Sequence, residues 1–159
     1  MPFMDLGRRN WALSNRVLSE LLKAVLDKGG EFRFRANGLS MSPFIRHRDI
    51  ITVSSVPEGT LRIGDIVAFL RSDKQRFAVH RVEKIERDGV FIKGDNTAES
   101  DGLIPMVNIL GRVSSVERNG KQVALGLGPE RRLIPFLTRP GLRPWLRPIW
   151  RFLRPIVRP

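Results

Sequence analysis

Residues 77–93 read FAVHRVEKIERDGVFIK, and this stretch is the clearest indicator of the fold. Two runs rich in β-branched and aromatic residues, 77–85 and 90–93, lie on either side of Asp88-Gly89. Such runs are typical of β-strands, and Asp-Gly is a dipeptide that favours tight turns. The stretch therefore predicts neighbouring strands joined by a short turn.

The same pattern extends from Glu31 to about Gly128. Phe32 and Phe34 alternate with charged residues, which is the two-residue period of a half-buried strand. Further β-rich runs occupy residues 50–56, 65–70, 109–116 and 122–125, with turn signals at Pro57-Glu58-Gly59 and Asn119-Gly120. We therefore predict a mainly β fold, with a compact and mostly antiparallel domain over residues 31–128.

Residues 1–30 have a helical period instead. After Asn10, a suitable N-cap, residues 11–28 place apolar side chains on one stripe, and Gly29-Gly30 ends the helix. The stripe consists of Leu18, Leu21, Leu22 and Val25. This N-terminal segment is expected to hold an amphipathic helix packed on the β domain. The alternative is a helix that lies on a membrane, with the Arg8-Arg9 pair leading.

Positive charge is concentrated at the C-terminal end. The 159-residue chain has 28 Lys+Arg against 16 Asp+Glu, a formal net charge of +12. Residues 131–159 contain eight arginines and no acidic residue, so the first 130 residues carry only +4. Arg-Pro recurs in this tail between Phe, Trp and Leu side chains, and prolines at 140, 144 and 148 oppose a regular helix. We expect an irregular tail over residues 129–159.

Arginines beside tryptophans, without acidic residues, suit the headgroup region of an anionic bilayer. We therefore expect residues 131–159 to bind an anionic membrane surface. The alternatives are docking on a partner protein or on the domain itself, and a tail that binds nucleic acid or is solvated. The body lacks an aromatic-basic readout motif, so no specific nucleic acid is expected as a partner.

The sequence also predicts how the chain relates to a membrane. Its longest uncharged runs are ten residues, whereas about 20 apolar residues are needed to cross a bilayer. The N-terminus lacks the pattern of a cleavable export signal. These features predict peripheral association with a membrane, on its cytoplasmic face.

Two residue types exclude whole classes of site. The chain has no cysteine, which excludes disulfides, thiolate metal sites and a cysteine nucleophile. Its histidines are His47 and His80 alone, so a multi-histidine metal site is excluded too. The acidic loop 93–101 lacks the ligand pattern of an EF-hand. No cofactor and no metal ion are therefore expected.

Three segments carry side chains suited to acyl-transfer chemistry. Ser40 stands in the loop GLSMSP, a context that by itself is usual for a turn. His80 lies among valines in a predicted strand, where a histidine is often structural, but imidazole is also the base that a serine hydroxyl needs near pH 7. In the loop 93–101, either Asp101 or Asp95 could orient His80 and stabilise its imidazolium.

The order of these segments is more specific than any one of them. The segments are GLSMSP at 38–43, RIGDIVAF at 62–69, VHRV at 79–82, KGDNTAESD at 93–101 and ILGRV at 109–113. In this order they resemble the signal peptidase I family, over residues 34–113. Members of that family are membrane-bound serine endopeptidases, which remove leader peptides after small residues and have a β-rich catalytic domain. The resemblance implies that fold and a polypeptide substrate.

The histidine selects a branch of that family. Common bacterial signal peptidases pair the serine with a lysine base, whereas the endoplasmic-reticulum, archaeal and sporulating-bacterial branch has histidine in a Val-His-Arg-Val context. The chain is therefore similar to the Ser-His-Asp branch. By that match Ser40 is the nucleophile and His80 the general base. Asp101 lies where the family's catalytic aspartate lies, and Asp95 is the supporting acid and the runner-up for that role.

Three departures separate the chain from typical members. A turn that usually reads Gly-Asp is Arg48-Asp49 here, although Asp49 and Asp65 still match aspartates that hold loop geometry. Gly38 stands where many bacterial relatives carry a hydroxyl that assists the Ser40 N–H in the oxyanion hole. The membrane helix that usually precedes the serine motif is replaced by the amphipathic helix.

The expected function is that of a serine endopeptidase of signal-peptidase type, which cleaves a leader or precursor peptide. A self-cleaving or regulatory peptidase like the SOS-repressor group, which shares the β fold, is the runner-up. That group has lysine where His80 stands here, and no helix-turn-helix precedes the domain in this chain. A catalytically silent binding module at a membrane surface is the third hypothesis, and the presence of serine, histidine and aspartate together argues against it.

Overall fold

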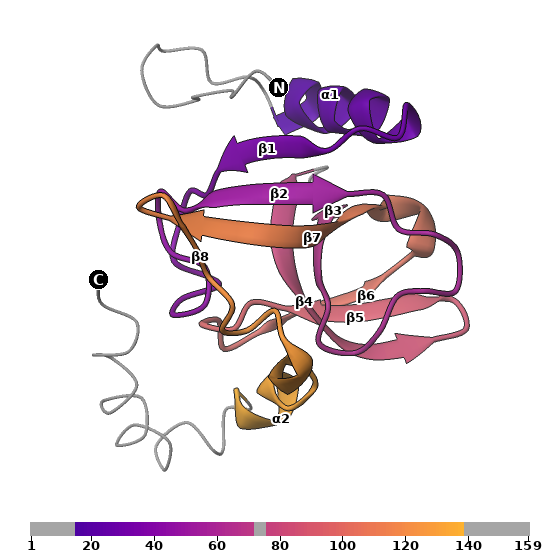
Figure 1. Ribbon diagram of the computed structural model, residues 1–159. Helices are drawn as coiled ribbons and strands as arrows, with labels where there is room; N and C mark the ends of the chain where they lie inside the picture. The colour runs from indigo at the N-terminus through magenta and orange to yellow at the C-terminus, as the bar shows by residue number, and fades with distance from the viewer. Residues whose placement is uncertain (1–14, 72–75, 139–159) are drawn as a thin grey trace.

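The protein folds into an antiparallel β domain with a helix on one side. The computed structural model describes residues 15–71 and 76–138. Its strands are β1 (Phe32–Arg35), β2 (Ile50–Ser54), β3 (Ile66–Leu70), β4 (Phe77–Glu86), β5 (Gly89–Lys93), β6 (Ser100–Ile104), β7 (Ile109–Arg118) and β8 (Lys121–Gln122). Its helical elements are α1 (Asn15–Asp27), the 3-10 helices η1 (Met106–Asn108) and η2 (Pro129–Arg132), and the single turn α2 (Ile134–Leu137). The predicted mainly β fold is confirmed (Figure 1).

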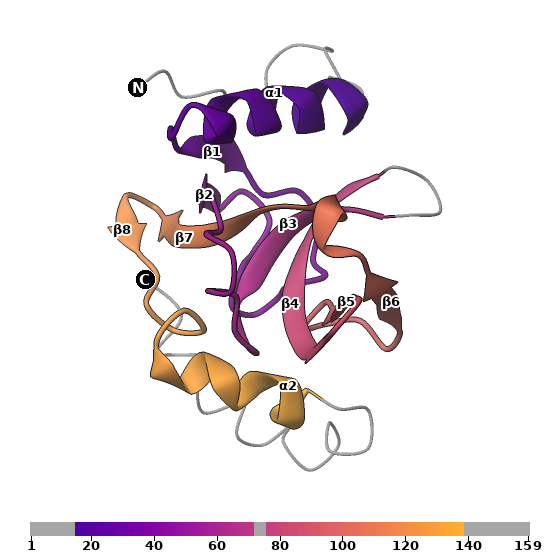
Figure 2. The same cartoon turned by 90° about the vertical axis from the view of Figure 1, so that its right-hand side faces the viewer.

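The strands form one sheet in the order β1-β2-β7-β3-β4-β5-β6, and β8 pairs with β7. Every strand pairing is antiparallel. Figure 2 shows α1 and α2 at opposite ends of the domain, with the strands between them. Strands β4 and β6 carry His80 and Asp101 of the candidate site, and the loop between β1 and β2 carries Ser40.

Strands β4 and β5 form the hairpin that the sequence indicates. Ile85 pairs with Val90, and Glu86 pairs with Gly89 across the turn. A register shift between Val82 and Lys84 bends the strand pair. The hairpin aligns the His-Arg dipeptide of β4 with the end of β5, which leads directly into the acidic loop.

Helix α1 packs on the domain. Leu22 and Leu26 are buried in one core cluster with Phe32 and Phe34 of β1, and Figure 1 shows α1 lying along β1. The helix ends at Gly29, whose φ of 72° is readily adopted only by glycine, and the Gly29 N–H donates to the Leu26 carbonyl. The apolar stripe of α1 therefore covers the core cluster that contains Phe32 and Phe34. A second core is formed by β3 to β6 with Leu61 and contains Leu61, Val67, Phe69, Val82, Val90, Ile92 and Ile104.

Three local predictions differ from the structure. Residues 100 and 101 were expected to belong to the acidic loop 93–101 but are the first two residues of β6, because β5 supplies an edge with which residues 100–104 pair. The run 122–125 contributes only Gln122 to β8. Residues 129–138, expected to be irregular, form η2 and α2, since each has a proline in its first turn, where proline is tolerated. The expected N-cap Asn10 and residues 139–159 of the tail lie outside the described residues.

The first prediction concerns the core. Ile51 is 2% exposed and Ile85 is 41% exposed, so the same substitution probes both environments. Ile51→Ala is expected to lower the free energy of unfolding by about 2–5 kcal/mol because it leaves a cavity. Ile85→Ala is the matched control and should cost less than about 1 kcal/mol. Urea unfolding measures both, and equal losses would contradict the packing described here.

Candidate active site

His80 and Asp101 form a buried pair across two strands. His80 Nδ1 lies 2.5 Å from Asp101 Oδ2, and the two side chains are 8% and 1% exposed. The Phe69 ring lies 5.9 Å from the imidazole, centroid to centroid, and shields it from one side. A carboxylate that accepts the Nδ1 proton fixes the imidazole tautomer and leaves Nε2 available as a base.

The second oxygen of Asp101 is also engaged. Arg71, which directly follows β3, donates a hydrogen bond from its guanidinium to Asp101 Oδ1. Burial by itself raises the pKa of Asp101, but the hydrogen bonds and charges of His80 and Arg71 lower it below the ordinary value. The carboxylate is therefore ionised at neutral pH. Its contribution to stability is present there and is lost as the pH falls through the folded-state pKa.

Asp95, the other candidate partner of His80, binds Arg81 instead. Arg81 Nε and Nη2 donate to Asp95 Oδ1 and Oδ2, each at 2.8 Å, and both side chains are at most 2% exposed. Because consecutive side chains of a strand point to opposite faces, His80 and Arg81 face different sides of β4. Burial raises the pKa of Asp95 more than the nearby cations, Arg81 first, lower it. The structure thus gives the two aspartates different partners.

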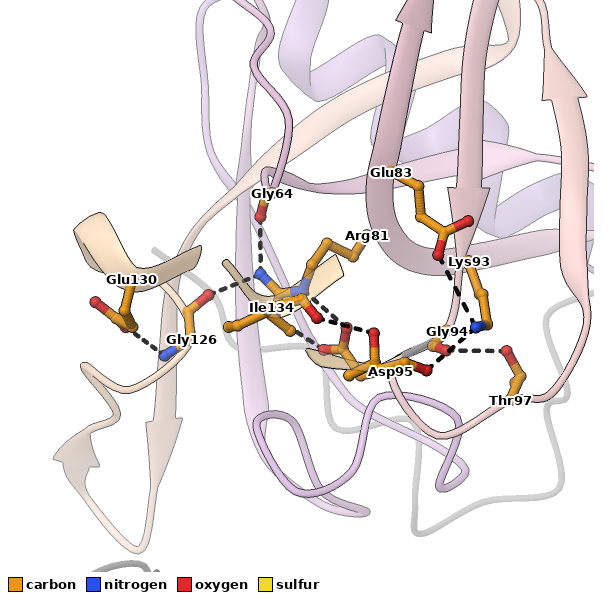
Figure 3. Close-up of polar contacts among 11 residues, drawn as sticks. Gly64, Arg81, Glu83, Lys93, Gly94, Asp95, Thr97, Gly126, Glu130 and Ile134 are labelled. Carbon is orange, nitrogen blue, oxygen red and sulfur yellow. Dashed lines mark hydrogen bonds and ion pairs between the residues drawn. The ribbon is translucent and has the colours of Figure 1, made fainter. Parts of the chain in front are cut away.

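The guanidinium of Arg81 joins four segments of the chain. Its Nη1 donates to the carbonyls of Gly64 and Gly126, at 2.7 and 2.9 Å (Figure 3). It also lies over the Phe44 ring, 5.2 Å from the centroid. Gly64 precedes β3, Gly126 follows β8, and Phe44 belongs to the loop that carries Ser40. Arg81 and Asp95 therefore hold these loops against β4.

The Ser40 loop is attached to the loop after β5. The Asn96 N–H donates to the Ser40 carbonyl at 2.7 Å, and Asn96 Nδ2 donates to the Leu39 carbonyl at 3.2 Å. Gly94 lies against the same carbonyl, where a Cβ would stand 2.8 Å from Ser40 O. Within residues 15–71 and 76–138, Ser40 Oγ and the Ser40 N–H make no hydrogen bond. The structure therefore holds the backbone of Ser40 and leaves its hydroxyl available.

Two aspartates hold the ends of the loops, as the sequence predicted. Asp49 accepts the Arg46 N–H at 2.7 Å, and Asp65 accepts the Arg62 N–H at 2.9 Å. Arg118 of β7 donates to both oxygens of Asp49 and also to the Phe44 carbonyl. These contacts close the return of the Ser40 loop into β2 and the turn into β3.

Sequence reasoning missed the structural role of the segment Lys93-Gly94-Asp95-Asn96. Its four residues do different work: Asp95 binds Arg81, Asn96 and Gly94 contact the Ser40 loop, and Lys93 Nζ donates to the Thr138 carbonyl at 3.4 Å. Arg81 within a predicted buried strand was the available signal, because a buried guanidinium requires an acidic partner. In the described part of the chain, no group of three or more His, Asp or Glu side chains is placed to hold a metal ion.

The second prediction tests the Arg81–Asp95 pair. Asp95→Asn leaves a buried guanidinium without its counter-charge, so the free energy of unfolding should fall by about 3–5 kcal/mol. Asp88→Asn, at an exposed turn position where asparagine is also favoured, is the control and should change it by less than about 0.5 kcal/mol. Chemical denaturation at neutral pH measures the difference. Asp95→Asn with the stability of the parent chain would refute the assigned role.

Comparisons with known proteins place the chain in a family. Comparison with curated protein sequences gives no match. Residues 9–114 match the family described as Peptidase S24-like, and this range includes Ser40, His80, Asp95 and Asp101. The family covers signal peptidases and self-cleaving peptidases of the LexA type. Because the match extends over more than half of the chain, the protein belongs to the Peptidase S24-like family and has a serine-peptidase-like fold.

Proposed function

We propose that the protein is a serine endopeptidase in which Ser40 is the nucleophile, His80 the general base and Asp101 the acid that supports it. The observation that carries this proposal is the buried His80–Asp101 pair, which is built from β4 and β6. An imidazole held by a carboxylate at Nδ1 is the arrangement that activates a serine hydroxyl. Family membership supports the same class of chemistry.

The sheet register supports placing Ser40 near this pair. Arg81, the neighbour of His80, pairs with Lys93 of β5. The next residue, Gly94, lies against the Ser40 carbonyl. Gly94 directly follows Lys93, the residue of β5 that pairs with the neighbour of His80. The loop that carries Ser40 therefore contacts β5 one residue beyond this pair. Catalytic hydrogen bonds are often long before substrate binds, so a hydroxyl without a partner fits the proposal.

The chemistry follows from these roles. His80 Nε2 takes the proton of Ser40 Oγ while the oxygen attacks a peptide carbonyl, and Asp101 stabilises the imidazolium that forms. The Ser40 N–H, which makes no hydrogen bond within the described residues, is a donor for the developing oxyanion. The protonated His80 gives its proton to the leaving amine, and water then hydrolyses the acyl-enzyme.

The substrate in this proposal is a leader or precursor peptide, as in the signal peptidases. Histidine in the place of a lysine base supports the Ser-His-Asp branch, and the buried partner of that histidine is consistent with it. Self-cleavage, as in the LexA-type members of the family, is the competing outcome. A catalytically silent binding module is the second competing outcome.

We also propose that the C-terminal segment, residues 131–159, contacts an anionic membrane surface. No helix within residues 15–71 and 76–138 has the length and apolarity to span a bilayer, so contact would be peripheral. The inner side of the segment is buried at Ile134 and Thr138, whereas Leu133, Phe136 and Leu137 are 62%, 54% and 43% exposed. Arg132, which is exposed, directly precedes Leu133, whereas Arg131 pairs with Asp65 at 3.0 Å. Exposed apolar side chains next to an arginine are the combination that binds anionic lipid.

The third prediction is Ser40-dependent cleavage. Purified protein with lipid vesicles should cut leader-type precursor peptides, and mass spectrometry should place the cuts after small residues. Ser40→Ala should reduce the rate to the background because the nucleophile is lost, a decrease of at least about 10³-fold.

Ser42→Ala, in the same loop, is the matched control and should retain cleavage. Cuts in the protein's own chain that disappear in Ser40→Ala would favour the self-cleaving alternative. If the parent chain and Ser40→Ala both fail to cut any precursor or themselves, the peptidase proposal is wrong.

The fourth prediction concerns lipid binding. The double variant Phe136→Ser and Leu137→Ser removes apolar side chains that would enter the lipid surface, so its partition onto phosphatidylglycerol vesicles should fall about tenfold. Ile85→Ser, an exposed apolar position on β4, is the control and should not change partition. Vesicle co-sedimentation at two salt concentrations measures both. Equal partition of the double variant and the parent chain would exclude this surface as the contact.

A further inference from the structure

Asp101 is bound from two sides by groups of different exposure. His80 contacts Oδ2, and Arg71 contacts Oδ1. The side chain of Asp101 is 1% exposed, whereas that of Arg71 is 42% exposed. The carboxylate therefore cannot rotate without breaking one of two charge-assisted contacts, and one of its partners reaches it from the surface of the protein.

We propose that Arg71 is a positioning residue of the site: it fixes the orientation of Asp101 and offsets part of its negative charge. This inference rests on the proposed function, since it concerns how the base is prepared. An unopposed buried carboxylate beside an imidazole favours the imidazolium, which cannot act as a base. A cation on the far oxygen offsets part of that charge, and together with His80 it lowers the pKa of the Asp101 carboxyl.

Among the charged groups around His80, Arg71 is the one placed to offset the charge of Asp101. Asp101 from β6 contacts the imidazole directly, Arg71 from the end of β3 contacts Asp101, and Asp95 from the loop after β5 interacts electrostatically with His80. The charge of Asp95 is countered by its bidentate contact with Arg81. Phe69 contributes an apolar face and no charge. Arg71 is therefore the cation that balances the acid bound directly to His80.

The side chain of Arg71 can be changed without removing the strand pairing that carries it. The Arg71 N–H donates to the Arg76 carbonyl at 3.0 Å, a backbone contact that closes the β3–β4 connection. Arg76 is exposed and its side chain has no ion pair within the described residues. It has the same charge at the opposite position of the same connection, so it is the matched control.

The fifth prediction is a shift in the titration of Asp101. NMR of the side-chain carboxyl carbons follows this titration, and Asp101→Asn assigns the Asp101 signal. Arg71→Met should move the Asp101 midpoint upward, since a hydrogen bond and a positive charge that lower the pKa of this carboxyl are lost. Arg71→Gln should move it upward too, because the charge is lost, and Arg71→Lys should reverse most of the shift. Arg76→Met should leave it unchanged.

Cleavage of a precursor peptide gives the second measurement. The acid limb of the kcat/KM profile should move to higher pH in Arg71→Met, because Asp101 is then protonated, and stops supporting His80, at a higher pH. The rate should recover on the alkaline plateau apart from any loss due to orientation. Arg71→Gln separates these effects, because it retains a donor and lacks the charge.

The two proposals can fail separately. If the parent chain does not cleave peptides in a Ser40-dependent way, the proposed function fails, and the NMR titration still tests the charge of Arg71. An Asp101 midpoint that is unchanged or lower in both Arg71→Met and Arg71→Gln overturns the inference. If Arg71→Met does not fold, Arg71→Gln decides by the same measurement.

Discussion

A buried guanidinium is the constraint on which the rest of the structure depends. Arg81 lies within the domain with four hydrogen bonds, two to Asp95 and one each to the carbonyls of Gly64 and Gly126. Phe44 lies beneath it. A buried charge is tolerated only if its donors are satisfied, so these segments must be correctly placed together. The pair therefore links the folding of the domain to the arrangement of its loops.

One strand supplies both this frame and the proposed chemistry. The side chain of His80 points to one face of β4 and that of Arg81 to the other, so any displacement of the strand would move both. Neighbouring residues of the loop after β5 also have different partners. Asp95 contacts Arg81, and the Asn96 N–H donates to the Ser40 carbonyl. The Ser40 loop is thus held by Asn96, which directly follows the partner of the buried arginine, whereas the imidazole of His80 is held by Asp101. The contacts that hold the Ser40 loop are therefore separate from those that orient the imidazole.

Charge balance distinguishes the two aspartates. Each accepts from a guanidinium, but Asp95 shares both oxygens with a buried one, whereas Asp101 divides its oxygens between His80 and the half-exposed Arg71. The first arrangement is a structural ion pair. The second leaves an imidazole in contact with a carboxylate whose charge is partly offset by a cation that solvent can reach. The difference agrees with a structural role for Asp95 and a functional role for Asp101.

The sequence by itself determined the elements with strong local signals and the residue types of the site. The turn at Asp88-Gly89, the helix stop at Gly29 and the order of the Ser40, His80 and acidic segments follow from local preferences and spacing. Only the tertiary structure decided that residues 100–104 form a strand and that Asp101 is the acid bound to His80. These depend on pairing between β5 and β6 and on the opposite faces of β4. Such contacts join residues that are far apart in the sequence. Their free energy depends on which groups are buried together in the folded protein, and a local sequence pattern does not show this.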